Sequence, residues 1–166
     1  MLGRGLAVAA AAAALDQASK FALLRHFGAH GCGFSEQVLT AFFKLVLTCN
    51  RGVSFGLFNR PGTDSLLFAI AAAAIVLVLL GWLTRVRTTR IAVAIGLVIG
   101  GAIGNAIDRL HFGGVIDFLY FHVGSWYWPA FNLADSAIFL GVAAMLLDGL
   151  LLRRAQSPSR GEDVSP

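Results

Sequence analysis

Charged side chains are scarce in this chain. Only 13% of its 166 residues are Asp, Glu, Lys or Arg, whereas 57% are hydrophobic. A soluble domain typically carries about 25% charged residues, so this chain has too few polar side chains to cover a water-facing surface. The composition therefore excludes an ordinary soluble domain and predicts one small integral membrane domain.

Cysteine is nearly absent. Cys32 and Cys49 are the only two, which excludes a framework of several disulfides. We interpret both as small structural residues. A single bridge between them stays open as an alternative if their segment faces an oxidising compartment.

Signals for metal chemistry are also missing. Neither CxxC nor HExxH spacing occurs, so no metal site is predicted. Ser19 and Lys20 are neighbours on a predicted helix and do not face each other, which disfavours a Ser–Lys dyad. The histidines are scattered between the apolar segments, and we interpret them as interfacial: His26, His30, His111 and His122.

The net charge of +4 is a topology signal and indicates no nucleic-acid partner. Seven of the 13 basic residues lie in the N-terminal stub, one short loop and the C-terminal tail: Arg4, Arg85, Arg87, Arg90, Arg153, Arg154 and Arg160. Lys and Arg accumulate on the cytoplasmic side of membrane proteins. We therefore expect both termini in the cytoplasm.

Four segments reach the roughly 20 apolar residues that a spanning helix needs: about 5–24, 65–83, 91–109 and 132–152. The first has a rival interpretation, because residues 1–4 and the alanine-rich run after them resemble a secretory signal peptide. Its apolar character resumes after Asp16 and Lys20, so we expect a retained helix.

The connections 25–64 and 110–131 then lie on the outer side of the membrane. Residues 40–58 are rich in β-branched and aromatic residues and predict one or two short strands. The run Trp126-Tyr127-Trp128 predicts an interfacial aromatic belt. Residues 1–154 form one predicted domain, and the polar residues 155–166 predict a disordered cytoplasmic tail.

Polar side chains within the apolar segments are informative because they are costly in a membrane. Asp16 and Lys20 are spaced i,i+4 in the order that favours an ion pair. Asp108 and Arg109 have the plain interpretation of a charge pair at headgroup level. Two stripes of residues, each with a four-residue period, run along the third segment. Gly96, Gly100 and Gly104 form one, which lets a neighbouring helix approach closely. The other, one step round the helix, ends in polar side chains and consists of Gly101, Asn105 and Arg109.

The fourth segment starts with Asn132 and Asp135. Their spacing fits an N-cap residue followed by an N3 residue, and taken alone Asp135 is better explained by this helix-start role than by catalysis. Asp148, near the inner end of the same segment, is expected to reach lipid headgroups or an arginine.

Asp117 stands in the apolar run GGVIDFLYF, although an unpaired buried charge costs several kcal/mol. Asp135 falls on the same outer side. Two carboxyls held close together share a proton, so one can act as base and the other as acid, as the attack of water on an amide requires. Nearby polar residues are expected to orient a substrate or stabilise an oxyanion: Asn50, Asn105, Arg109 and Asn132.

Five blocks, in this order, resemble the bacterial lipoprotein signal peptidases, which are type II signal peptidases and membrane aspartyl proteases. The blocks are LDQASK (15–20), CNRGVSFG (49–56), GGAIGNAIDR (100–109), GGVIDF (113–118) and FNLADSAI (131–138). This chain departs mildly from the family pattern in two places. It has Ser19 where the family more often has threonine, and it has Gly-Val-Ser-Phe at residues 52–55 where the family more often has Gly-Ala-Ala-Phe. These departures concern the shape of the outer sheet and leave the aspartates in place.

The resemblance implies an all-α membrane protein with four transmembrane helices and a small extracytoplasmic β-sheet cradle. It implies a multi-pass enzyme of the bacterial cytoplasmic (inner) membrane, in contact with lipid and with its active site near the outer face. The enzyme would cleave a prolipoprotein just before the diacylglyceryl-modified cysteine. No cofactor is required, globomycin is expected to block the site, and a monomer is expected.

On this resemblance Asp117 and Asp135 are the catalytic pair. The supporting or substrate-binding positions fall on Asp16, Lys20, Asn50, Gly101, Asn105, Asp108, Arg109 and Asn132.

Two other functional classes stay open on the residues alone. A transporter or proton-coupled channel could use Asp16, Asp108 and Asp135 along an ion path, and a purely structural membrane protein is the third class. A transport path needs polar residues at every depth, whereas the second segment carries no charge. The polar residues gather toward the outer side, which favours the peptidase.

Overall fold

The computed structural model describes residues 1–52 and 63–156. Its elements, in chain order, are α1 (Leu2–His26), β1 (Ser35–Val38), β2 (Phe43–Asn50), α2 (Thr63–Leu83), α3 (Thr89–Phe112), β3 (Val115–Val123), β4 (Trp126–Tyr127) and α4 (Leu133–Gln156). Four of these helices are long and apolar enough to cross a membrane. The predicted fold class is confirmed, and each helix overlaps one predicted span.

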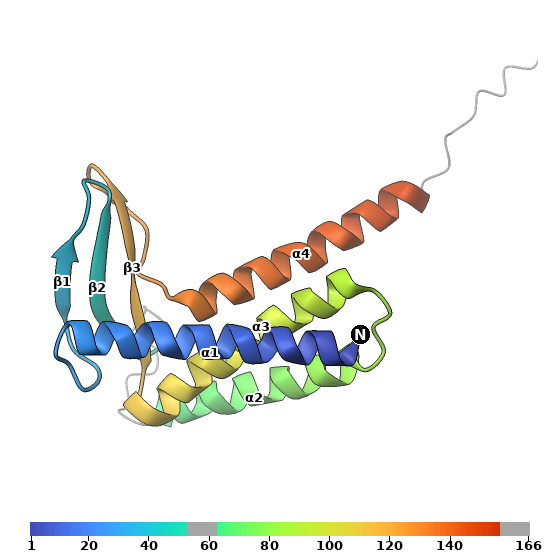
Figure 1. Cartoon of the computed structure of the whole chain (residues 1–166), viewed down its shortest axis with the longest axis horizontal. Coiled ribbons are helices and arrows are strands. Elements are labelled where there is room, and N and C mark those ends of the chain that lie inside the picture. Colours follow the sequence, from blue (N-terminus) through green and yellow to red (C-terminus); the bar gives the residue numbers. More distant parts are fainter. Residues whose placement is uncertain (53–62, 157–166) are drawn as a thin grey trace, which may run out of the picture.

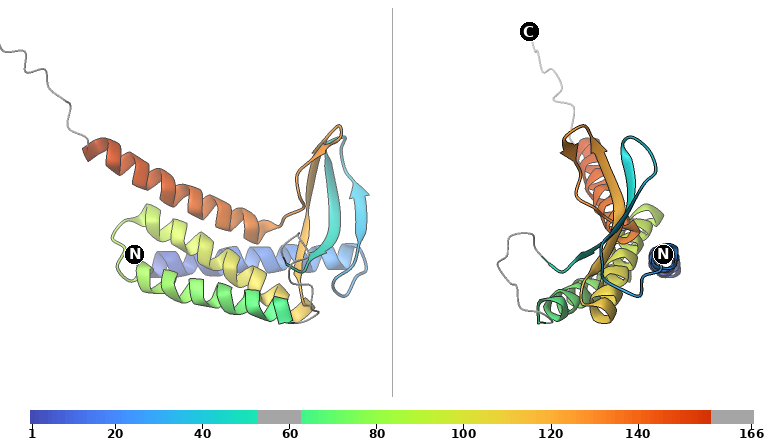
Figure 2. Two further views of the ribbon diagram at one scale, coloured as in Figure 1. Left: turned by 180° about the vertical axis from the view of Figure 1, so that it is seen from behind. Right: turned by 90° about the vertical axis from the view of Figure 1, so that its left-hand side faces the viewer.

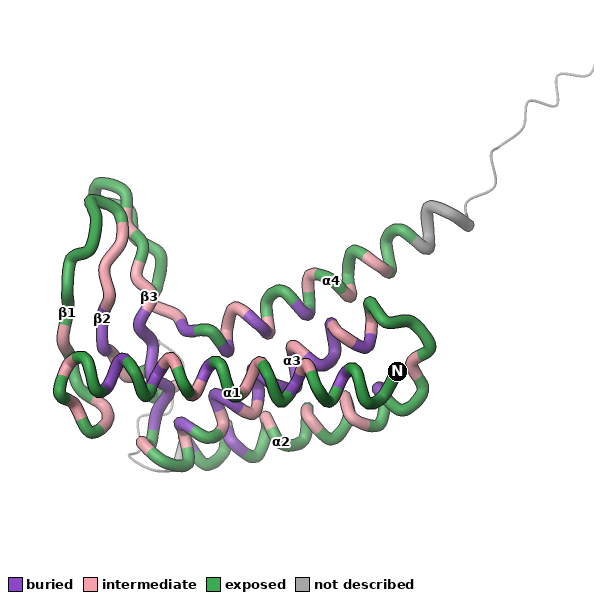
Figure 3. The backbone as a smooth tube through the Cα atoms, in the orientation of Figure 1, coloured by how far each residue is buried: buried purple, intermediate pink, exposed green. Residues whose placement is uncertain are grey.

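Helix α3 lies at the centre of the bundle and is buried along most of its length, whereas the other helices expose apolar faces (Figures 1 and 3). The two stripes of α3 explain this position. A Cβ at Gly100 would lie 2.5 Å from the Ala9 carbonyl oxygen of α1, and one at Gly101 would collide with the Ala134 carbonyl of α4. Small residues on adjacent faces therefore let α3 contact a helix on each side.

The outer faces of α2 and α4 carry large exposed apolar side chains, among them Leu67, Val78 and Phe139. A water-facing surface would not tolerate such rows, whereas lipid tails solvate them. In the C-terminal half of α4, Asp148 reaches Arg90 at 4.0 Å, which confirms the expectation that it contacts an arginine. Among the described residues, the exposed surface of the bundle is thus that of a membrane-embedded protein.

The strands form an antiparallel sheet in the order β1-β2-β3-β4. It crosses the end of the bundle where α1 finishes and α4 begins (Figures 1 and 2). Leu23 and Leu24 of α1 pack against Leu47, Ile116 and Phe118, so the inner face of the sheet is fixed to the helices. In the β2–β3 register, Thr48 lies opposite Asp117.

The strand predictions were partly right. β2 falls within residues 40–58 and confirms one strand there, while β1 lies outside that range. Residues 53–58 and 157–166 lie outside the described residues. Residues 155 and 156 belong to α4, so the helix extends two residues into the predicted tail.

A turn at Gly113 leads from α3 into β3. Gly113 has φ +71, the left-handed conformation that ends many helices and favours glycine, and its N–H donates to the Arg109 carbonyl at 3.1 Å. Gly114 follows, where a Cβ would lie 2.7 Å from the Cys49 sulfur. The two glycines thus allow β3 to start beside β2 directly after the helix.

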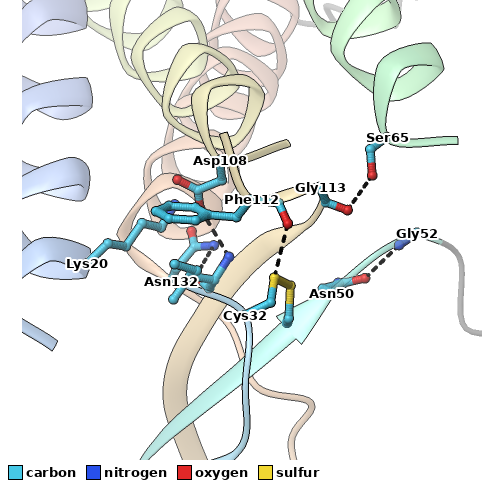
Figure 4. Close-up of a disulfide and its surroundings, with 11 residues drawn as sticks. Lys20, Cys32, Asn50, Gly52, Ser65, Asp108, Phe112, Gly113 and Asn132 are labelled. Carbon is cyan, nitrogen blue, oxygen red and sulfur yellow. Dashed lines mark hydrogen bonds and ion pairs between the residues drawn. A yellow bond between two sulfur atoms is a disulfide. The ribbon is translucent and has the colours of Figure 1, made fainter. Parts of the chain in front are cut away.

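The interpretation of the cysteines as unpaired small residues was wrong. Cys32 and Cys49 form a disulfide across 17 positions of sequence, and the Cys32 sulfur also contacts the Phe112 carbonyl at 3.4 Å (Figure 4). The bridge ties the segment after α1 to the end of β2. Sequence spacing could not show this pairing, because it depends on how the sheet folds back over α1.

Replacing both Cys32 and Cys49 with Ser is expected to lower the melting temperature in detergent by several degrees. A cross-link that closes a loop of about 15 residues contributes about 3 kcal/mol in the chain-entropy description. Dithiothreitol should lower the melting temperature of the wild type to that of the double variant and leave the variant unchanged. A wild-type melting temperature that is insensitive to reductant would contradict the bridge.

Candidate active site

Helix α4 begins with a reciprocal pair of hydrogen bonds. The Asp135 N–H donates to Asn132 Oδ1 at 2.9 Å, and the Asn132 N–H donates to Asp135 Oδ2 at 3.3 Å. This is a capping box, which satisfies two backbone donors at a helix start, and it confirms the helix-start interpretation of both residues. Asp135 Oδ1 is left for another partner, the Nδ2 group of Asn105 at 2.8 Å.

Asp117 lies on β3 with only 3% of its surface exposed. Its Oδ1 accepts a hydrogen bond from Asn132 Nδ2 at 2.7 Å. The same Asn132 amide donates to Asn105 Oδ1 and to the Ile116 carbonyl, both at 3.2 Å. Asn132 therefore contacts both predicted catalytic carboxyls, and the structure brings together the loop-separated pair that the sequence suggested.

Burial, and after it the charge of Asp135, raise the pKa of Asp117 from an ordinary 3.8 to about 7. Contacts with the Asn132 and Asn50 amides and the charge of Lys20 act against this rise. A carboxyl with this pKa, beside a second one, holds a proton near neutral pH. The pair can therefore offer a proton donor and a proton acceptor at the same time.

Arg109 and Asn50 border the two carboxyls. The Arg109 guanidinium donates to the Asn105 carbonyl at 3.2 Å and lies 5.4 Å above the ring of Phe68. Its Nε is buried and has no hydrogen-bond partner within the described part of the chain. Asn50, at the exposed end of β2, accepts a hydrogen bond from the Gly52 N–H at 3.2 Å (Figure 4).

Asp108 does not form the headgroup-level pair with Arg109 that the plain interpretation proposed, and that interpretation was wrong. Asp108 is fully buried and forms an ion pair with Lys20 at 2.7 Å. Lys20 also pairs with Asp16 at 2.7 Å, which confirms the predicted i,i+4 pair of α1. Neighbouring residues on a helix point about 100° apart, so Asp108 faces α1 while Arg109 faces α2.

Gln17 is a site residue that sequence reasoning missed. Its Nε2 donates to Asp108 Oδ1 at 2.9 Å, to the Gly104 carbonyl at 3.2 Å and to Asp16 Oδ2 at 3.3 Å. The signal was present, because an amide in an apolar helix is as informative as a carboxylate. Gly101, from the predicted set, contributes no side chain and acts by letting α4 approach α3.

One connected polar cluster lies where the helices meet the sheet, made by Asp16, Lys20, Asn105, Asp108, Asn132 and Asp135. Figure 4 shows three of them, Lys20, Asp108 and Asn132. Among the described residues, no group of three or more His, Cys, Asp or Glu could hold a metal ion. Four membrane-length helices are closed at one end by a sheet, and two carboxyls, the buried Asp117 and the partly buried Asp135, lie where they meet. These features define a multi-pass membrane protein equipped for acid–base chemistry.

Comparison with known proteins identifies the family. The family model described as signal peptidase (SPase) II matches residues 8–151, and the chain belongs to this family. It is a bacterial membrane protease that removes signal peptides from prolipoproteins. The matched region includes most of α1.

Curated relatives agree with this assignment. The chain is 45% identical to the lipoprotein signal peptidase of Methylorubrum extorquens (strain PA1) over 148 residues, covering 88% of this chain and 85% of the relative. It is 45% identical to that of Rhodopseudomonas palustris (strain TIE-1), covering 89% and 92%. A bacterial membrane enzyme of known structure superimposes with a TM-score of 0.76 at 24% identity, covering 96% of this chain and 95% of that one.

Replacing Asp117 with Asn is expected to raise the melting temperature, and to raise it more at pH 8 than at pH 5. The folded protein keeps the Asp117 proton up to about pH 7, whereas the unfolded chain releases it near pH 4. The destabilisation from this group therefore grows between about pH 4 and pH 7 and is constant above. Asparagine does not ionise, so the variant avoids this destabilisation. Melting curves in detergent from pH 5 to pH 8 measure the difference, and a difference independent of pH would contradict the raised pKa.

Proposed function

We propose that Asp117 and Asp135 are the catalytic pair of an aspartyl protease. The observation that carries this proposal is their common partner: the side chain of Asn132 donates to Asp117, and its backbone N–H donates to Asp135. Asn105 then holds the second oxygen of Asp135. The two carboxyls come from a strand, β3, and from the first turn of α4.

The proposed roles follow from the surroundings of each carboxyl. Asp135 lies in the first turn of α4, where the positive end of the helix dipole and two N–H donors suit a carboxylate, and it acts as the base. Asp117, with a pKa near 7, carries the shared proton and acts as the acid. Asp135 takes a proton from water while the water oxygen bonds to the amide carbon, and Asp117 protonates the carbonyl oxygen.

The tetrahedral diol then collapses. One diol hydroxyl returns its proton to Asp117 as the carbonyl re-forms, the C–N bond breaks, and the leaving nitrogen receives the proton held by Asp135. Arg109 is proposed to orient the substrate through Nε, which is buried and without a partner among the described residues. Asn50, exposed beside the pair, is proposed to hold the substrate backbone.

The substrate is proposed to be a prolipoprotein whose cysteine already carries a diacylglyceryl group, cut on the N-terminal side of that cysteine. The exposed apolar faces of α2 and α4 support lateral entry with the acyl chains still in the bilayer. A globomycin-type peptide would compete for the same site. Residues 1–154 would act as one monomeric domain, and the C-terminal tail that follows α4 would be cytoplasmic.

We also propose that the site lies near the outer face of the cytoplasmic membrane and that both termini are cytoplasmic. The support is the arginine content of the loop between α2 and α3, which carries Arg85 and Arg87 at the end of the bundle opposite the sheet (Figure 2). Positive charge marks the cytoplasmic side, so the sheet and the carboxyls lie outside. This concentration of polar groups at one end does not fit a transport path.

Asp117→Asn and Asp135→Asn are each expected to reduce cleavage of a lipid-modified prolipoprotein peptide by at least about 10³-fold, because residues that act as a unit fail singly. Asp148→Asn is the matched control. It makes the same replacement on α4, next to Arg90 and away from the site, and should keep wild-type activity. Proteoliposomes with each variant and a gel assay for the released signal peptide measure the rates. Normal cleavage by either dyad variant would disprove the assignment.

A phosphatase reporter inserted in the β3–β4 turn at Gly124 should be active outside the cytoplasm, whereas one inserted at Arg87 should be inactive. The reason is the arginine-rich α2–α3 loop, which stays on the cytoplasmic side. The reverse pattern of reporter activity would place the carboxyl pair inside the cell and contradict the proposed orientation.

A further inference from the structure

Two buried carboxylates outside the proposed catalytic pair anchor the backbone next to it. Asp16 Oδ1 accepts a hydrogen bond from the Ala134 N–H at 2.9 Å, and Ala134 immediately precedes Asp135. Asp108 Oδ2 accepts from the Ile116 N–H at 3.0 Å, and Ile116 immediately precedes Asp117. The chain is therefore held one residue upstream of each member of the pair.

Lys20 joins the two anchors. Its ammonium lies 2.7 Å from Asp16 Oδ2 and 2.7 Å from Asp108 Oδ2. It also donates to Asn105 Oδ1 at 3.4 Å, and Asn105 in turn donates to Asp135. An ammonium has three N–H donors, and here each has an acceptor. Each acceptor is in turn hydrogen-bonded to Asp135 or to the residue before Asp117 or Asp135.

Every carboxylate oxygen of this cluster has a donor. Asp16 Oδ1 and Asp108 Oδ2 accept from the two backbone N–H groups, and the Gln17 amide reaches Asp16 Oδ2 and Asp108 Oδ1. Fully satisfied buried networks specify one arrangement of the elements that contribute to them. This network joins α1, α3, β3 and the first turn of α4 at a single point.

Stability alone is a poor explanation for the cluster. Asp16 and Asp108 are 0% exposed and Lys20 is 2% exposed, so three charges are desolvated and one carboxylate remains in excess. Buried ion clusters of this kind often add less stability than an apolar replacement. The same burial separates these side chains from any bound substrate, whereas catalytic geometry must be held to within about 1 Å.

We propose that Asp16, Lys20 and Asp108 form a positioning clamp that sets the separation of Asp117 and Asp135 through the Ile116 and Ala134 peptide groups. The clamp rests on the proposed catalytic pair and deepens it. These three residues act by holding the backbone next to Asp117 and Asp135, and they do not contact the substrate.

The test uses alanine and asparagine at Asp108. Asp108→Ala removes the acceptor for the Ile116 N–H and leaves Lys20 paired with Asp16, a balanced buried pair, so folding is expected to survive. Asp108→Asn keeps one oxygen to accept from the Ile116 N–H. Asp148→Ala is the matched control on α4. Turnover per folded molecule, KM and the pH profile are measured in proteoliposomes with a lipid-modified peptide, and melting temperature is measured in detergent.

The clamp predicts that Asp108→Ala lowers kcat about 100-fold, changes KM less than threefold and shifts the alkaline limb of the pH profile by at least about half a pH unit toward acid, because carboxyls held less closely repel each other less. Asp108→Asn should recover at least tenfold of the lost kcat. A purely structural role would reduce the folded fraction and leave kcat per folded molecule and the pH limb unchanged.

Each remaining outcome also tests either the clamp or the catalytic pair. The clamp is overturned if Asp108→Ala keeps the wild-type kcat and the wild-type alkaline pH limb. It is also overturned if Asp108→Asn loses as much kcat as Asp108→Ala. Neither result contradicts the catalytic pair. Cleavage by Asp117→Asn, run in parallel, overturns the pair itself. If Asp108→Ala does not fold, Asp16→Ala, which leaves the balanced Lys20–Asp108 pair, is judged by the same readouts. If neither folds, the cluster holds the fold and the positioning role is rejected.

Discussion

The arrangement of this protein depends on the ion pairs that the buried Lys20 ammonium forms. A charge inside an apolar bundle must be matched by partners with satisfied hydrogen bonds, and Lys20 finds them on two different helices, as Asp16 on α1 and Asp108 on α3. Both carboxylates continue to peptide N–H groups, of α4 and of β3. One ion cluster therefore links the bundle to the sheet and explains why a charged residue persists in each of these apolar segments.

The cluster can form only because the backbones approach closely. A Cβ at Gly104 would lie 2.5 Å from Asp16 Oδ2, and one at Gly100 would lie 2.7 Å from the Ala12 Cβ. In a membrane, where lipid competes with apolar side chains for contact, small residues provide the close packing that brings helices together. The glycine stripe and the ion cluster are thus one constraint, because the short approach of α1 to α3 is what lets Asp16 and Lys20 reach Asp108.

Much of this could be predicted from sequence because the signals are local. Apolar run length gives the four spans, the four-residue period of α3 gives its two contact faces, and the i,i+4 spacing gives the Asp16–Lys20 pair. The partner of Asp108 could not be read in the same way, because Lys20 lies on another helix and the neighbouring Arg109 suggests a nearer pair. The Cys32–Cys49 bridge and the edge strand β1 depend likewise on contacts between segments that only the folded sheet brings together.

A polar site in a membrane protein must satisfy its own hydrogen bonds before substrate arrives, since lipid offers none. Asp135 shows how this requirement shapes the site: one oxygen completes a capping box and the other accepts from Asn105. Asn132 is shared between the helix start and Asp117 in the same way. Within the described part of the chain, the unpartnered buried side-chain atoms are Arg109 Nε and His122 Nε2. Of these, Arg109 Nε belongs to the side chain that borders the carboxyl pair, so a substrate carbonyl that reached it would complete the hydrogen bonding of the site as it bound.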